Sequence, residues 1–136
     1  MQVDEFDEPS KLMKGIELYF GTDLDRWLAC FDPPFAFVTP EATTVARDES
    51  TARRQFGPAF EALQAAGFAS SVAESVTTKY AGPDLAFVDA SFKRAHRDGT
   101  FMGRAAALYV CRRRGSQWRI AAVIQHPPES PVLPVG

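Results

Sequence analysis

Three polar side chains in the second half of the chain interrupt strongly apolar stretches. Asp89 and Ser91 lie two residues apart in "LAFVDASFK", and Gln125 follows the apolar run in "WRIAAVIQ". Residues two apart share one face of a β-strand. A carboxylate removed from water among apolar side chains is a candidate general base, and hydroxyl and amide groups beside it would orient a bound molecule. The alternative is a structural Asp89 that bonds a nearby hydroxyl such as Thr78, or an arginine.

Arg104 is a candidate of a different kind. With Glu74 and Lys93 it would form a row of alternating charge across three strands, which is typical of a salt-bridge ladder. If its guanidinium instead faces a cavity mouth, it would bind a ligand carboxylate. His96 beside the "RDG" turn and His126 before two prolines are expected to be packed or solvated rather than catalytic.

Composition excludes several classes of protein. The 136 residues carry a net charge of −2, which argues against a nucleic-acid partner, and no stretch is long and apolar enough to cross a membrane. Cys30 and Cys111 have no companion at metal-binding spacing, so we expect reduced thiols and neither a zinc site nor a disulfide. The acidic start, with Asp4 and Glu5, is unlike an export signal, and the expected location is cytoplasmic.

Apolar spacing predicts the elements that position these residues. Helices are expected from Pro9 to Phe20, from Asp23 to Phe31, and from Asp48 or Ser50 up to Gly67. "FAFVT" and "TTVA" read as short strands, and an antiparallel meander follows over 68–81, 85–97, 100–114 and 117–126. The expected division is a single domain over 1–126 and a proline-rich tail over 127–136.

The segments "YFGTDLDRWLACFDPPFAFVTP" and "GSQWRIAAVIQH" resemble the nuclear transport factor 2-like superfamily, which includes the SnoaL-like proteins. The resemblance covers residues from about 10 to 126. It implies an α+β cone, in which a curved antiparallel sheet wraps around three N-terminal helices. The superfamily includes isomerases, dehydratases, epoxide hydrolases, cyclases, transport adaptors and oligomerisation hubs, so the fold does not select an activity.

The steroid isomerase-like members of that superfamily carry an acid before a proline, a second acid on the long strand, and a tyrosine on the first helix. The matching positions here are Thr39, Leu108 and Gly15. All three differ from the family pattern, so the resemblance does not support that chemistry.

Two-residue turns at Asp98–Gly99 and Gly115–Ser116 set the expected strand register. They place Lys93 opposite Arg104, and Leu108 opposite both Asp89 and Val123. One face then carries Asp89, Ser91, Arg104, Leu108, Val123 and Gln125, and the other carries Val88, Phe92, Tyr109, Ile120 and Ile124. The second face is the more apolar, and the resemblance implies a homodimer interface there. A slip of one residue would exchange the two faces of a strand.

The resemblance also implies a cavity on the first face, walled by Tyr19, Trp27, Phe31, Phe56 and Phe60 from the helical side. The expected protein is a dimeric SnoaL-like binder of a small apolar molecule. An enzymatic version would use Asp89 as base and Gln125 or Arg104 to orient the substrate, in an isomerase, hydratase or cyclase reaction without metal or organic cofactor. The alternative is a non-catalytic dimerisation or protein-interaction module.

Overall fold

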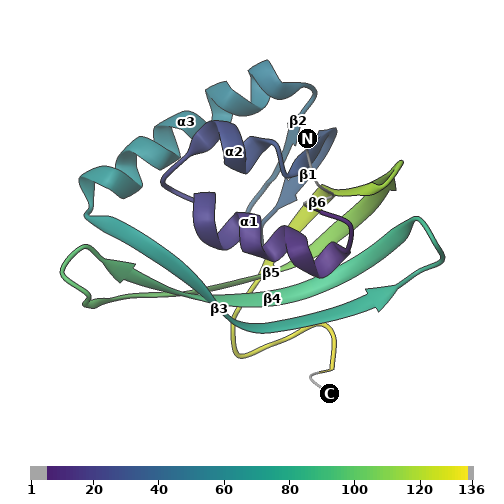
Figure 1. Cartoon of the computed structure of the whole chain (residues 1–136). Helices are drawn as coiled ribbons and strands as arrows, with labels where there is room; N and C mark the ends of the chain where they lie inside the picture. The colour runs from purple at the N-terminus through teal and green to yellow at the C-terminus, as the bar shows by residue number, and fades with distance from the viewer. Residues whose placement is uncertain (1–5, 135–136) are drawn as a thin grey trace.

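A computed structural model describes residues 6–134, in which helices precede most of the sheet (Figure 1). The helical elements are the 3₁₀ turn Pro9–Lys11, α1 (Leu12–Tyr19), α2 (Leu24–Leu28) and α3 (Glu49–Ala65). The strands are β1 (Phe31–Val38), β2 (Thr43–Ala46), β3 (Phe68–Tyr80), β4 (Leu85–His96), β5 (Phe101–Arg114) and β6 (Gln117–His126). The predicted boundaries of the long meander are therefore confirmed to within about two residues.

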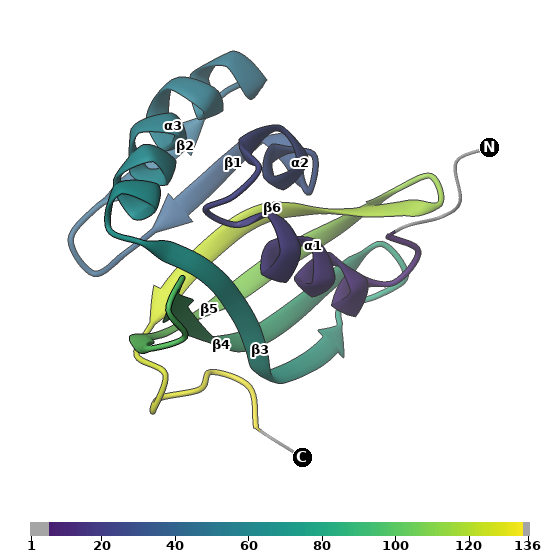
Figure 2. The ribbon, with the colours of Figure 1, turned by 60° about the vertical axis from the view of Figure 1, so that its left-hand side comes forward.

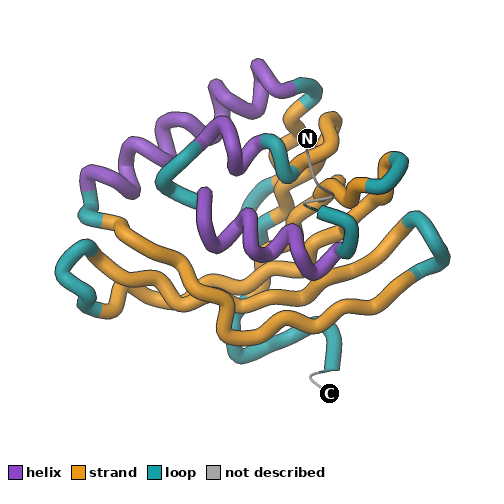
Figure 3. The backbone as a smooth tube through the Cα atoms, viewed as in Figure 1, coloured by secondary structure: helices purple, strands orange, loops and turns teal. Residues whose placement is uncertain are grey.

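The described strands form a six-stranded sheet in the order β2-β1-β6-β5-β4-β3. Among them, β1 and β6 pair in parallel, and the other neighbours are antiparallel. The long strands curve, and the helices lie on one side of them (Figure 2). Figure 3 distinguishes the helices from the strands by colour. This is the expected α+β cone. Within residues 6–134, no helix has the length and apolar character needed to cross a membrane.

Side-chain caps begin two of the helices. The Asp23 carboxylate accepts a hydrogen bond from the Arg26 amide at 3.1 Å, and the Asp48 carboxylate accepts one from the Thr51 amide at 2.7 Å. The prediction that the second helix continues to Phe31 was wrong. Phe31 begins β1 instead, because its neighbouring Cys30 carbonyl accepts a hydrogen bond from the Ile120 amide at 2.8 Å.

The register between β4 and β5 agrees with the prediction: Lys93 lies opposite Arg104, and Asp89 opposite Leu108. The register between β5 and β6 does not. An irregularity between Val110 and Cys111 shifts the pairing by one residue, so Leu108 lies opposite Ile124 rather than Val123. Because the side-chain period of a strand is two, this shift changes which β6 residues share a face with β5.

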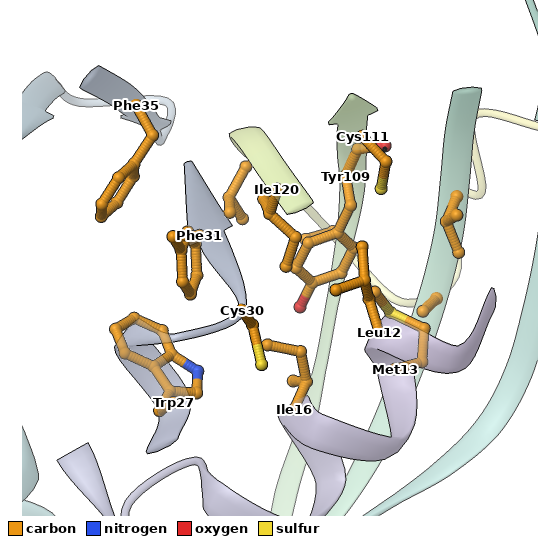
Figure 4. Packing of buried hydrophobic residues seen from close by; sticks show 14 of the residues in the cluster. Leu12, Met13, Ile16, Trp27, Cys30, Phe31, Phe35, Tyr109, Cys111 and Ile120 are labelled. Carbon is orange, nitrogen blue, oxygen red and sulfur yellow. Dashed lines mark hydrogen bonds between the residues drawn. The ribbon is translucent and has the colours of Figure 1, made fainter. Parts of the chain in front are cut away.

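The two sheet faces are exchanged relative to the prediction. Val88, Phe92, Tyr109 and Ile120 are between 0 and 7% exposed and belong to the core beneath the helices. Figure 4 shows Tyr109 reaching from β5 toward Leu12, Met13 and Ile16 of α1. These four residues are therefore not available for the predicted homodimer interface. The more apolar face is covered by the chain's own helices. The strand pattern shows that this face is buried but not whether helices or a second subunit cover it.

Candidate functional site

A cavity of about 290 Å³ lies between the helices and the inner face of the sheet. Most of its wall is apolar. Its lining residues are Ile16, Phe20, Trp27, Phe31, Phe37, Phe56, Ala59, Phe60, Ser71, Phe92, Arg94, Ala105, Ala106, Ala107, Tyr109, Val123 and Gln125. Ala59 and Gln125 are exposed, so the cavity opens near α3 and the end of β6.

Trp27 stands at the centre of the aromatic wall. Its ring centroid lies 4.6 Å from that of Phe31, 5.2 Å from Phe60 and 5.3 Å from Phe56. All four are residues that the sequence placed on this wall. Tyr19, which was grouped with them, does not line the cavity; its ring instead lies beneath the Arg26 guanidinium, 5.6 Å from centroid to Cζ. The rings form a surface suited to a flat apolar molecule.

The opposite wall is the floor made by β4 and β5. Ala105 and Ala107 contribute small side chains there, which leaves the space that Trp27 and its neighbours enclose. Besides Trp27, whose indole N–H is buried without a hydrogen-bond partner among the described residues, the lining includes four polar side chains: Ser71, Arg94, Tyr109 and Gln125. Burial raises the pKa of the Tyr109 phenol, so it remains a neutral hydroxyl throughout the physiological range.

Among the described lining residues there is no Asp, Glu, His, Lys or Cys. General acid–base catalysis needs a group that exchanges protons near neutral pH, and neither a guanidinium nor a buried phenol does so readily. The cavity therefore offers shape, apolar contact and fixed hydrogen-bonding groups.

Asp89, the predicted catalytic base, lies outside the cavity. It is 5% exposed because the C-terminal tail covers it on the face of the sheet away from the helices (Figure 1). Its Oδ2 accepts hydrogen bonds from the amides of Val132 at 2.6 Å and Leu133 at 2.9 Å, and its Oδ1 lies 2.6 Å from Nε2 of His126. The carboxylate thus anchors residues 132–133 on the outer face. Asp89 therefore has the structural role given above as the alternative, with His126 and the tail amides as partners in place of Thr78 or an arginine.

Ser91, Arg104 and Leu108 share that outer face with Asp89 and do not line the cavity. Arg104 donates to Glu74 through Nε at 2.8 Å, as the salt-bridge interpretation predicted. Gln125 and Val123 do line the cavity, because the irregularity in the β5–β6 pairing brings them to the inner face.

Arg94 and Ser71 are the lining residues that sequence reasoning missed. A signal for Arg94 was present: it follows Val88, Ala90 and Phe92 at alternate positions of β4, and so shares the most apolar face of the strand. The prediction of a dimer interface on that face gave its single charge no role in binding a ligand. Ser71 lies opposite Arg94 on β3 and is 4% exposed.

The curved sheet around three helices, with an apolar cavity inside, defines an α+β cone of the NTF2-like class. Residues 13–128 match the family model described as NTF2-like protein (DUF6841). The chain belongs to this family. No curated protein is significantly similar to it in sequence.

Solved structures with the same fold are distant in sequence. An NTF2-like protein with a cystatin-like fold from Novosphingobium aromaticivorans is 19% identical with a TM-score of 0.69, covering 88% of this chain and 79% of that one. A Nostoc punctiforme protein of unknown function is 16% identical with a TM-score of 0.68, covering 89% and 90%. A Thiobacillus denitrificans protein, provisionally described as a calcium/calmodulin-dependent protein kinase type II association domain, is 19% identical with a TM-score of 0.68, covering 90% and 96%.

Proposed function

We propose that this protein binds a small, mostly apolar molecule in the cavity of its cone. The observation that carries the proposal is a cavity of about 290 Å³, walled by aromatic rings and continuous with the hydrophobic core. That volume is near the lower end of the range of about 300–1,000 Å³ for small-molecule sites, which suits a ligand of one or two fused rings. Ser71, Tyr109 and Gln125 would orient its polar atoms.

The wall residues argue for binding rather than for an enzyme with a carboxylate base. Asp89 is engaged with His126 and the tail on the far side of the sheet, and no described acid replaces it in the cavity. The two buried free cysteines fit a reducing compartment, so a cytoplasmic location remains part of the proposal.

Filling the cavity should abolish binding. In Ala105→Phe a ring projects from the β5 floor into the space beneath Trp27 and displaces the ligand. For neutral 2-naphthamide we expect a Kd on the order of 100 µM with the wild-type protein. We expect the Kd to rise at least about tenfold in the variant, measured by isothermal titration calorimetry.

Two variants serve as controls for this measurement. Ala69→Phe makes the same substitution at an exposed position of β3, and Asp89→Asn changes the carboxylate on the outer face. Both should bind 2-naphthamide as the wild-type protein does. Absence of any 2-naphthamide binding to the wild-type protein would count against the proposed function, and loss of binding in Asp89→Asn would restore Asp89 as a site residue.

A second candidate function is self-association through the outer face of the sheet. Phe87, Leu108, Val110 and Ile124 are half-buried side chains on neighbouring strands β4, β5 and β6. They lie on the side away from the helices, on the same face as the tail residues that Asp89 binds. An apolar group of this kind is typical of a homodimer interface. This face replaces the one that the sequence suggested, and it leaves the cavity free.

Sedimentation velocity tests the homodimer. We expect a wild-type dimer at micromolar concentration and a monomer for Leu108→Glu, because a carboxylate would be buried without a partner in the interface. Leu18→Glu is the matched control, since Leu18 lies on α1 and is 64% exposed. A wild-type monomer, or equal dissociation of both variants, contradicts an interface at this face.

A further inference from the structure

The cavity contains a positive charge, that of Arg94, which has no negative partner among the residues that the structure describes. The Cζ of Arg94 lies 4.5 Å from the centroid of the Phe20 ring, and its Nε is buried without a hydrogen bond. No carboxylate within residues 6–134 forms an ion pair with it. Other arginines of the chain do pair with carboxylates: Arg53, Arg104, Arg112, Arg113 and Arg114. Arg94 therefore differs from these arginines because no carboxylate of the described residues lies beside it.

The Phe20 ring contacts the Arg94 guanidinium but does not neutralise its charge. The titratable group that interacts with Arg94 is the Tyr109 phenol, which is neutral at physiological pH. Burial lowers the pKa of Arg94, yet a guanidinium keeps its proton at neutral pH. Keeping such a charge partly out of water disfavours folding unless something compensates. An anionic group from outside the chain would provide the compensation.

The remainder of the wall limits what that anion is. One guanidinium matches one negative charge, and its planar donors match the two oxygens of a carboxylate. Ser71 lies opposite Arg94 in the β3–β4 pairing, and Tyr109 also lines the cavity, so hydroxyl groups stand near the same end. The described lining near the Trp27 ring carries no charged side chain and would disfavour a second charge on the ligand.

We propose that the ligand of this cavity is a small aromatic or alicyclic monocarboxylate, held by its carboxylate at Arg94 and by its ring against Trp27 and Phe60. The proposal rests on the proposed function and specifies the class of its ligand. No covalent step is involved. The carboxylate binds as the anion, and Arg94 binds and orients it without exchanging a proton.

Paired ligands of the same shape test the charge separately from the cavity. In isothermal titration calorimetry at constant ionic strength, 2-naphthoate should bind the wild-type protein about 10- to 100-fold more tightly than 2-naphthamide. Arg94→Met keeps a side chain of similar length and removes the charge, so the preference for 2-naphthoate should disappear while 2-naphthamide still binds. Arg94→Lys should retain part of the preference, because it keeps the charge without the planar donors.

Arg104→Met is the matched control, since it removes an arginine from the adjacent strand on the opposite face, where Glu74 neutralises it. It should keep the full preference for 2-naphthoate. Equal binding of the two ligands by the wild-type protein overturns the carboxylate proposal and leaves the apolar cavity intact. Binding of neither ligand overturns both proposals. A preference that survives in a folded Arg94→Met protein assigns the carboxylate to another residue.

Discussion

Gly21→Ala should reduce the free energy of unfolding by about 3 kcal/mol. Gly21 joins α1 to α2 with φ at +74°, in the left-handed region that L-residues with a Cβ atom disfavour. An added Cβ would also lie 2.7 and 2.8 Å from two ring carbons of Phe68. Phe68 is 1% exposed and packs edge-on against Phe20, with centroids 5.7 Å apart, so its ring cannot move aside freely.

Gly99→Ala is the control that separates the strain of a positive φ from the steric clash with Phe68. Gly99 has φ at +88° in the exposed turn between β4 and β5, and no atom lies within 4 Å of a Cβ built there. We expect this variant to lose about 1 kcal/mol, from backbone strain alone. Urea unfolding of both variants and the wild-type protein measures the difference. Equal losses in the two variants would show that the Phe68 contact does not constrain Gly21.

Raising the pH from 7.5 to 10.5 should destabilise the fold by about 2 kcal/mol through Cys111 alone. Cys111 is 0% exposed, and burial raises the pKa of its thiol from 9.0 to about 12. The folded protein therefore keeps this proton while the unfolded chain releases it above about pH 9. The stabilisation is complete below the unfolded pKa and is lost as the pH rises toward the folded pKa. The raised pKa of the Tyr109 phenol acts in the same direction.

Urea unfolding at the two pH values checks this effect. Cys111→Ala lowers stability at both, because a packed sulfur is lost, so the decisive quantity is the change between pH 7.5 and 10.5. That change should be about 2 kcal/mol smaller in the variant than in the wild-type protein. The same alkaline loss in both proteins would show that Cys111 does not carry it.

The order and type of the elements could be predicted from the sequence because local signals agree with one another. Gly21 and Gly67 end helical patterns, Asp48 begins one, and turns such as "DG" at Asp98 separate strands of period two. The pairing of Lys93 with Arg104 followed from the length of one turn. The match of residues 13–128 to the NTF2-like family agrees with this arrangement.

The sequence predicted the helical wall of the site and misplaced the strand residues, because local patterns determine the orientation of a helix but not of a two-sided sheet. The helices that carry Trp27 and Phe60 each have one apolar face, which packs inward. Both residues line the cavity, as predicted. The strands have two apolar faces, and period two says which residues share a face but not which face the helices cover. Asp89, Ser91, Leu108 and Arg104 were grouped correctly and placed on the wrong side.

By itself, the sequence determined the succession of elements, the caps and turns that bound them, and the aromatic side of the cone, because each depends on neighbours along the chain. Tertiary structure decided the rest. One extra residue in β6 moved Gln125 to the cavity, and the return of the tail buried Asp89 against Val132 and Leu133. The packing of the helices on the apolar face enclosed Arg94 beside the Phe20 ring. These outcomes depend on which segments, distant in sequence, pack against each face of the sheet. The local periodicity of a strand does not contain that information.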